Sequence, residues 1–208
     1  MSTNDHLNQI YRCNYILDEK ILCVIRKIER DNFVPESYKS FSYSDISIPL
    51  GPNSHMLTPS CEAMILQEME FHENDNVLVV GNGSGHLTEC LAYITNSVSA
   101  YEHDASIYEF GKKNLDAHSK NRHRIYLYNE NIFNSVEKIS KYTKIVFTCS
   151  MKSYNSFVKY LGENSKTFTF LWQEKSPYST GIVINKARNS YTLNKNIVTS
   201  QTDLIVEI

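Results

Sequence analysis

Between residues 76 and 149 the chain alternates short runs rich in β-branched and aromatic residues with longer segments of helical character. The strand-like runs read "NVLVV", "SVSAYE", "RIYLY" and "KIVFTC". Helices are predicted between them at Gly85–Thr95, Ala105–Ala117 and around Phe133–Ser140. This order is the signature of a mostly parallel sheet with helices on both faces. We therefore expect an α/β fold.

The region after residue 150 is richer in strands. A helix predicted at Ser153–Leu161 is followed by the strand-like runs "KTFTFLW", "TGIVINKA" and "NIVTSQTDLIVEI". Strands that follow one another without intervening helices favour antiparallel pairing. The expected sheet thus has about seven strands, estimated from these runs, and an antiparallel C-terminal edge.

An N-terminal helical extension is predicted before the sheet. In "DEKILCVIRKIER", which begins at Asp18, four apolar residues share one helical face: Ile21, Leu22, Ile25 and Ile28. The next segment has three prolines, Pro35, Pro49 and Pro52. Because prolines exclude long regular elements, this segment is expected to be an ordered arm or loop. Thr58 and Pro59 then have the form of an N-cap and a first helical residue, which predicts a helix over "PSCEAMILQEMEF".

The composition limits the classes of partner. The chain has 208 residues, a length typical of one α/β domain. A net charge of -2 offers no general attraction for nucleic acid or for an anionic membrane. No apolar run approaches the ~20 residues that span a bilayer. Five cysteines form no C-x-x-C pair and seven histidines form no metal-type cluster. We therefore expect a cytoplasmic protein with reduced thiols, no metal, no nucleic-acid partner and no membrane partner; its oligomeric state stays open.

The turn after the first strand of the predicted sheet carries the strongest binding signal. In "VLVVGNGSGHLTECLAY" the spacing is G-x-G-x-G, with glycines at Gly81, Gly83 and Gly85. His86 stands where a dinucleotide fingerprint has its third glycine, which disfavours NAD or FAD. Glycines let the backbone approach a ligand closely, and Asn82 and Ser84 add hydrogen-bonding groups. This pattern is typical of class I S-adenosylmethionine-dependent methyltransferases, so we predict that these five residues bind S-adenosyl-L-methionine.

Polar residues follow the next strands as well. Glu102 ends the second strand about 20 residues after the first glycine, where an acidic side chain accepts hydrogen bonds from ribose hydroxyls. Glu130 and Asn131 end the third strand and are predicted to face the adenine. The carboxyl ends of parallel strands lie at one edge of a sheet. These residues are therefore expected to lie in the same cofactor site, beside residues 148–150 of the fourth strand.

Several segments together resemble the protein-L-isoaspartate O-methyltransferase family. They are "RDNFVP" from Arg30, "YSDISIPLG" from Tyr43, the proline at Pro59, "VLVVGNGSG" and Glu102, and they span residues 18 to 150. The family esterifies the abnormal isoaspartyl carboxylate of damaged proteins with S-adenosylmethionine, which is a protein-repair reaction. The resemblance implies a Rossmann-like class I methyltransferase fold and a protein or peptide substrate. It also implies a single domain over residues 1–208, with N-terminal helices and a substrate-side loop in 1–75 and the cofactor-binding sheet in 76–208.

The sequence departs from the family in the loop after Gly51. Counting without a gap places Leu57 at the family serine that lies near the transferred methyl group, with His55 and Ser54 at the preceding threonine and glutamine. Leucine has no hydrogen-bonding group. We therefore name Ser54, His55 and Thr58 as candidate catalytic residues, although Thr58 is equally explained as a helix cap.

Three further departures widen the range of functions. Val79 stands where the family has an acid, "NEN" at Asn129 replaces "GDG", and "VTSQTDLIVEI" has no counterpart of the C-terminal substrate segment. A carboxylate is ionised at neutral pH and needs no strong base, so positioning alone can support its methylation. Three hypotheses follow: a carboxylate methyltransferase of this family, a methyltransferase with another acceptor, and a catalytically silent binding or regulatory member.

Overall fold

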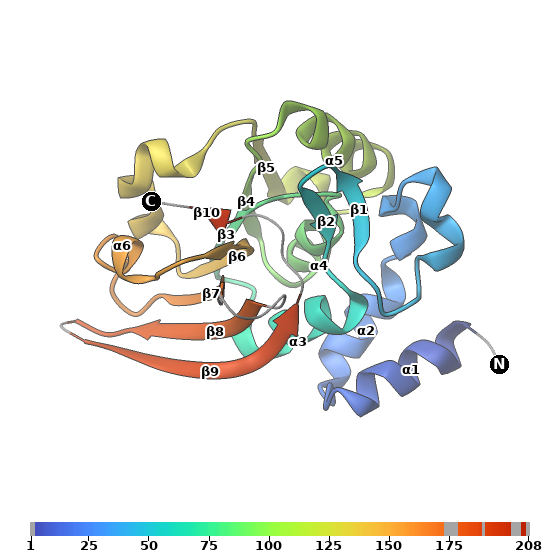
Figure 1. Cartoon of the computed structure of the whole chain (residues 1–208), viewed down its shortest axis with the longest axis horizontal. Coiled ribbons are helices and arrows are strands. Elements are labelled where there is room, and N and C mark those ends of the chain that lie inside the picture. Colours follow the sequence, from blue (N-terminus) through green and yellow to red (C-terminus); the bar gives the residue numbers. More distant parts are fainter. Residues whose placement is uncertain (1–2, 173–178, 189, 201–204, 207–208) are drawn as a thin grey trace.

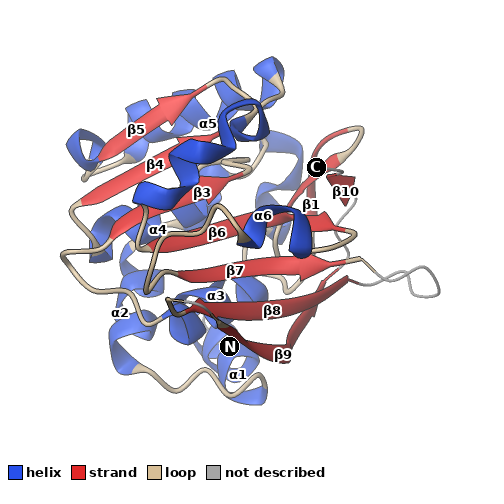
Figure 2. Ribbon diagram, turned by 90° about the vertical axis from the view of Figure 1, so that its left-hand side faces the viewer, coloured by secondary structure: helices blue, strands red, loops and turns tan. Residues whose placement is uncertain are grey.

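The computed structural model describes residues 3–172, 179–188, 190–200 and 205–206 (Figure 1). The strands of its main sheet are β3 (Asn76–Val80), β4 (Ser97–Tyr101), β5 (Ile125–Tyr128), β6 (Lys144–Met151), β7 (Lys166–Leu171), β8 (Ser179–Lys186), β9 (Tyr191–Ser200) and β10 (Ile205–Val206). Their order is β5-β4-β3-β6-β7-β8-β9, with β10 paired to β6. Figure 2 shows this order from β5 at the top to β9 at the bottom.

The pairing directions confirm the predicted sheet. Strands β3 to β7 pair in parallel, and β8 and β9 are antiparallel to their neighbours. The change of direction at β8 follows from the short connection between the end of β7 at Leu171 and the start of β8 at Ser179, because parallel neighbours need a crossover of about a dozen residues or more. The α/β class and the antiparallel C-terminal edge are therefore as predicted.

Six α-helices and four 3₁₀ helices are found in the described residues. The α-helices are α1 (Thr3–Cys13), α2 (Glu19–Lys27), α3 (Pro59–Met69), α4 (His86–Ile94), α5 (Ala105–His118) and α6 (Asn155–Val158). The 3₁₀ helices are η1 (Arg30–Phe33), η2 (Glu36–Phe41), η3 (Arg122–Arg124) and η4 (Ile132–Lys141). A separate hairpin pairs β1 (Ile48–Gly51) with β2 (Ser54–Met56). In Figure 1 this hairpin lies beside α4 and α5.

The sheet separates two apolar layers. Along β3, Val77 and Val79 belong to the layer that includes residues of α2, α3 and α4. Leu78 and Val80 belong to the opposite layer, which η4 and α6 cover. Successive side chains of a strand point to opposite faces, and a parallel strand covered on both faces is apolar throughout. The run "NVLVV" is apolar for this reason, and the predicted helices on both faces are confirmed.

Local signals located most helix ends correctly. Asp18 caps α2 by accepting a hydrogen bond from Lys20 N, and Thr58 caps α3 by accepting one from Cys61 N, with Pro59 at the first position. The predicted helices before and after the glycine turn are likewise present. Among the described helices, none combines the length and apolar character needed to cross a membrane.

Five elements differ from the sequence-based expectation. The helix predicted around Phe133 is the 3₁₀ helix η4, because Ser135 has non-helical φ/ψ angles that prevent a continuous α-helix. The helix predicted from Ser153 to Leu161 is only the single turn α6. Helix α1 was not predicted, and the arm contains the β1–β2 hairpin. The last predicted strand is divided into parts of β9 and β10, and its residues 201–204 and 207–208 lie outside the described residues.

Candidate active site

The glycine turn between β3 and α4 has a backbone that other residues rarely adopt. The φ angles are +91° at Gly81, +55° at Gly83 and +89° at Gly85. A Cβ atom at Gly81 would lie 2.2 Å from Thr148 Oγ1, and one at Gly85 would lie 2.8 Å from Leu115 Cγ. Glycine removes both the conformational strain and these contacts. Two of the three glycines therefore let the turn pack directly against β6 and α5.

Gly83 has a different environment. Among the described residues, a Cβ built there would meet Leu50 Cδ1 at 3.4 Å, an ordinary contact distance, so this position is less crowded than Gly81 or Gly85. The Gly83 N–H donates a 3.1 Å hydrogen bond to Glu102 Oε2. Glu102 is buried at the end of β4. The predicted meeting of the glycine turn with Glu102 thus occurs, because their two strands are adjacent and parallel.

Glu102 retains capacity to bind a ligand. Its Oε1 accepts a hydrogen bond from Asp104 N at 3.3 Å and lies 3.4 Å from His103 Nδ1. An ionised carboxylate offers about four acceptor positions, so lone pairs remain after these contacts. Asp104 itself is occupied as the N-cap of α5; its hydrogen bonds, chiefly from Ser106, lower the pKa of this exposed carboxyl. Glu102 is therefore the carboxylate of this strand end that is available to ribose hydroxyls.

A recess lies between the glycine turn and the β2 loop. It encloses about 50 Å³, room for a few water molecules, and is open on one side. The lining residues come from the β2–α3 region, from the glycine turn and α4, and from β6 and the end of β4. They are Ser54, His55, Met56, Leu57 and Glu62; Gly81, Asn82, Gly83, Ser84 and Leu87; and Thr148 and Glu102. The recess therefore brings together part of the predicted cofactor side, Gly81 to Ser84 and Glu102, with Ser54 and His55 of the predicted acceptor side. We call residues 54–57 the acceptor wall.

Buried polar contacts support the glycine turn. Asn82 accepts a 2.8 Å hydrogen bond from Thr88 Oγ1. Thr148 Oγ1 donates to the backbone oxygens of Val80, at 3.1 Å, and Gly81, at 2.8 Å. Asn114 Nδ2 donates to Ser84 O at 3.0 Å. Since each contact is made to backbone or to a neighbouring buried side chain, the turn is rigid before any ligand binds.

The acceptor wall holds two of the three candidate catalytic residues. Ser54 and His55 line the recess, whereas Thr58 is the cap of α3 and is not part of the lining. Leu57 also lines the recess and packs in the apolar core. The geometry thus brings polar atoms to this wall from Ser54 and His55 rather than from position 57.

Glu130 and Asn131 lie elsewhere. The side chain of Glu130 is 57% exposed, with Oε2 3.9 Å from Lys138 Nζ. Asn131 accepts a hydrogen bond from Phe133 N and caps η4. Neither residue lines the recess. At this strand end it is Asn129 that reaches toward the site, because its Nδ2 donates a 2.9 Å hydrogen bond to Glu102 O.

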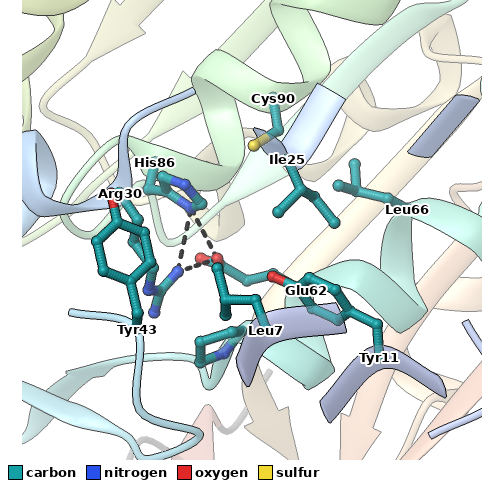
Figure 3. A pocket seen from close by; sticks show the side chains of 10 residues that line it. Leu7, Tyr11, Ile25, Arg30, Tyr43, Glu62, Leu66, His86 and Cys90 are labelled. Carbon is teal, nitrogen blue, oxygen red and sulfur yellow. Dashed lines mark hydrogen bonds and ion pairs between the residues drawn. The ribbon is translucent and has the colours of Figure 1, made fainter. Parts of the chain in front are cut away.

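Glu62 was not identified from the sequence. It lies on α3, lines the recess, and pairs with Arg30 of η1 and with His86 at the start of α4 (Figure 3). Burial raises the pKa of Glu62, but Arg30 and, to a lesser extent, His86 lower it by more than burial raises it. The pKa of Glu62 is therefore below its ordinary value. The one available signal was a glutamate in the otherwise apolar run "CEAMIL".

Val79 lies outside the recess, and the described residues form no group of metal ligands. Val79, at the position of the family acid, is buried in the core of β3 and does not line the recess. Across the described part of the chain, no three His, Cys, Asp or Glu side chains are grouped so as to hold a metal ion. The chemistry of the recess therefore depends on carboxylates, hydroxyls, an imidazole and backbone N–H groups.

A mixed sheet whose parallel part has a glycine turn after β3 and a buried glutamate after β4, and whose C-terminal edge is antiparallel, has the arrangement of a Rossmann-like class I methyltransferase fold. The family model for Protein-L-isoaspartate(D-aspartate) O-methyltransferase (PCMT) matches residues 1–158. The chain belongs to the protein-L-isoaspartate O-methyltransferase family.

Individual relatives agree with this assignment. A protein-L-isoaspartate O-methyltransferase of Petrotoga mobilis is 34% identical over 101 residues, which cover 49% of this chain and 47% of the relative. One of Aliivibrio fischeri is 33% identical over 106 residues, which cover 51% of each chain. The chain thus matches about half the length of these curated relatives.

The structural comparison shows the same fold. A crystal structure of a Plasmodium falciparum protein described as a protein-L-isoaspartate O-methyltransferase, in complex with S-adenosyl-L-homocysteine, has a TM-score of 0.78 to this chain. The match covers 94% of both chains at 16% sequence identity. The likeness therefore extends beyond residue 158 to the C-terminal strands.

Proposed function

We propose that the recess binds S-adenosyl-L-methionine and that the chain transfers its methyl group to a protein or peptide carboxylate such as isoaspartyl. The observation that carries this proposal is the meeting of Gly83 and Glu102 in a recess whose other wall contains Ser54 and His55. A donor site and an acceptor site must share such a space for direct methyl transfer. We also propose that residues 1–208 form one functional domain, because residues 1–75 and 76–208 each contribute lining.

The residues of the recess suit parts of this cofactor, the remainder of which would extend through the open side, because the enclosed space of about 50 Å³ holds only a few water molecules. The less crowded position of Gly83 allows close approach of a ligand to the backbone, and the free lone pairs of Glu102 suit ribose hydroxyls. Asn82 and Ser84 are buried beside them and are suited to the polar amino-acid part. When bound, S-adenosylmethionine supplies an electrophilic methyl group on a sulfonium. The carboxylate of Glu102 lines the recess and suits a sulfonium electrostatically, whereas Glu62 is already paired with Arg30.

The acceptor wall has a positioning role in this proposal. A carboxylate nucleophile is ionised at neutral pH, so no residue needs to remove a proton from it. Ser54 carries a hydroxyl that can donate a hydrogen bond to an acceptor carboxylate, and His55 lies next to it. Leu57 and Met56 exclude water from the same wall. Alignment in a dry recess is worth up to roughly 7–11 kcal/mol in favourable cases.

The buried Leu57 also favours a second candidate function. Its side chain offers no hydrogen bond at the position of the family serine, so an acceptor other than isoaspartyl, or a binding role without transfer, is consistent with the same recess. We place either function in the cytoplasm, because Cys13, Cys23, Cys90 and Cys149 are free thiols.

Calorimetric titration with S-adenosylhomocysteine tests the cofactor site. We expect binding, and a Kd raised about tenfold or more by Glu102→Ala, since hydrogen bonds to a charged group contribute about 1.5–3 kcal/mol. Asp116→Asn is the control, because its exposed ion pair with Arg122 lies outside the recess. Absence of binding by the wild-type protein would contradict both methyltransferase hypotheses and favour the silent member.

Transfer of a labelled methyl group then tests the acceptor. An isoaspartyl peptide and the same peptide with normal aspartate are compared in parallel. Label on the isoaspartyl peptide alone supports the proposal. Label on extract proteins but on neither peptide identifies a different acceptor, and binding without any transfer identifies the silent member.

A further inference from the structure

We propose that Glu62 is a positioning residue that fixes the distance between the acceptor wall and the glycine turn by pairing at once with Arg30 and His86. The inference rests on the proposed function, since it concerns the geometry of the same recess. Its physical basis is the buried network of Glu62, Arg30 and His86 (Figure 3), of which Glu62 also lines the recess.

Arg30 connects Glu62 to the acceptor wall. Its Nη1 pairs with Glu62 Oε2, and its Nη2 donates a 2.6 Å hydrogen bond to Leu57 O. Arg30 is 3% exposed and Glu62 is 5% exposed. A guanidinium holds its donors in one rigid plane, so the two contacts fix the Leu57 backbone relative to α3. Arg30 therefore acts on the recess through the backbone carbonyl of Leu57, which is itself a lining residue.

His86 connects the same Glu62 oxygen to the glycine turn. Its Nδ1 lies 2.7 Å from Glu62 Oε2, and the residue follows Gly85 directly at the first position of α4. An ionised carboxylate only accepts hydrogen bonds, so this contact requires a proton on Nδ1. Arg30 Nη1 lies 3.1 Å from the same nitrogen. One carboxylate oxygen thus holds the two sides of the recess together.

A purely stabilising role accounts poorly for this network. Replacing a buried ion pair with apolar residues of similar volume is often neutral or stabilising. Neighbours of Glu62 on α3, such as Ala63 and Ile65, are fully buried and apolar. A buried network that apolar residues could replace without loss of stability is better explained by the positions that it fixes.

A second contact serves the same turn independently. Asn114 donates to Ser84 O at 3.0 Å and to Phe33 O at 3.4 Å, which connects the glycine turn to η1. Since Arg30 and Phe33 are the first and last residues of η1, this short helix is attached to both walls. Asn114 thus connects η1 to the glycine turn without Glu62, whereas Glu62 is the group that joins α3 to both Arg30 and His86.

Amide hydrogen exchange tests the coupling without any ligand. Glu62→Gln keeps the size of the side chain but removes its charge. We expect exchange to accelerate about tenfold in two segments, 54–57 and 83–87, relative to the rest of the chain, since removing one buried partner costs about 1–3 kcal/mol. Arg30→Lys, which reaches fewer partners, should accelerate segment 54–57 more than segment 83–87.

The matched control is Glu89→Gln. Glu89 is a buried carboxylate like Glu62, but it lies on α4. It accepts hydrogen bonds from Lys120 N at 3.2 Å and from Asn121 Nδ2 at 3.3 Å, away from the recess. This variant should lower thermal stability while leaving relative exchange at 54–57 and 83–87 unchanged. If Glu62→Gln lowers stability in the same manner, with no local acceleration, Glu62 is only structural and the inference is refuted.

Cofactor affinity provides the second measurement. We expect Glu62→Gln to raise the Kd of S-adenosylhomocysteine about tenfold and Glu89→Gln to change it less than twofold. Loss of the His86 Nδ1–H resonance in Glu62→Gln gives a spectroscopic check of the histidine contact. If the wild-type protein binds no S-adenosylhomocysteine, the proposed function fails while the exchange result still decides the inference. If Glu62→Gln does not fold, Arg30→Lys decides it.

Discussion

Gly111 is the residue at which a single methyl group should have the most informative effect. It lies on α5 with ordinary helical geometry, so alanine would suit its backbone. A Cβ atom there would lie 2.3 Å from Gly83 O and 2.5 Å from Asn82 Nδ2. Ordinary contacts begin at about 3.4 Å, so either α5 or the glycine turn must move by roughly 1 Å in Gly111→Ala.

Two opposing effects set the change in stability. Alanine gains about 1 kcal/mol over glycine within a helix. Overpacking against a backbone carbonyl costs about 1–3 kcal/mol, because a carbonyl in a tight turn has little freedom to shift. The net expectation is a loss of about 1 kcal/mol, or a fall in Tm of about 3 °C for a chain of this size. The effect on binding should be larger, since a displacement of about 1 Å in a site can cost up to a hundredfold.

The assay combines thermal unfolding with calorimetric titration of S-adenosylhomocysteine. We expect Gly111→Ala to raise the Kd of S-adenosylhomocysteine more than tenfold, because the turn shifts by roughly 1 Å, while the protein stays folded at 25 °C. Gly162→Ala is the control, because its Cβ would lie 2.3 Å from Ser140 O, on the other side of the sheet from the recess. A Gly111→Ala protein that is more stable than the wild type and binds with the same Kd would refute the reasoning.

Three further outcomes are expected. Thr58→Ala should lower the free energy of unfolding by about 1 kcal/mol through loss of the α3 cap, with kcat unchanged in a methyl-transfer assay; a large fall in kcat at constant stability would instead make Thr58 catalytic. Because the pKa of Glu62 is lowered in the folded state, its ionised form stabilises the protein above its unfolded pKa of about 4.5. This contribution is lost as the pH falls further. The difference in free energy of unfolding between the wild type and Glu62→Gln should therefore become smaller with falling pH in acid denaturation experiments. Leu57→Ser should cost about 3 kcal/mol of stability by removing a buried side chain and should raise the rate of methyl transfer to an isoaspartyl peptide, and no rise would argue for another acceptor.

Local patterns predicted that the glycine turn and Glu102 would meet. They do so because β3 and β4 are adjacent parallel strands, and the glycine spacing together with the strand pattern identified both residues' positions at the strand ends. Thr58 and Pro59 located the start of α3 through their own backbone chemistry. These successes share a physical origin, since each depends on residues close in sequence or on a standard strand arrangement.

Long-range contacts explain what the sequence did not reveal. Helix α1 has no strong local signal, and Leu7 and Tyr11 pack in an apolar cluster with Ala63 of α3. The pairing of Glu62 with Arg30 and His86 joins three elements that no periodicity relates. The placement of Glu130 at an exposed strand end likewise depends on how the chain turns after β5. Such features are set by tertiary packing, which local propensity does not encode.

The recess has walls from segments as distant in the chain as Ser54 and Thr148, so the site exists only in the folded state. A ligand that binds there and not to the unfolded chain shifts the folding equilibrium by mass action. At a ligand concentration of about 100 times the Kd, the added stability is about 2.7 kcal/mol. The supply of methyl donor in the surroundings would thus help to determine how much of this chain is folded, and its resistance to proteolysis would follow the donor concentration.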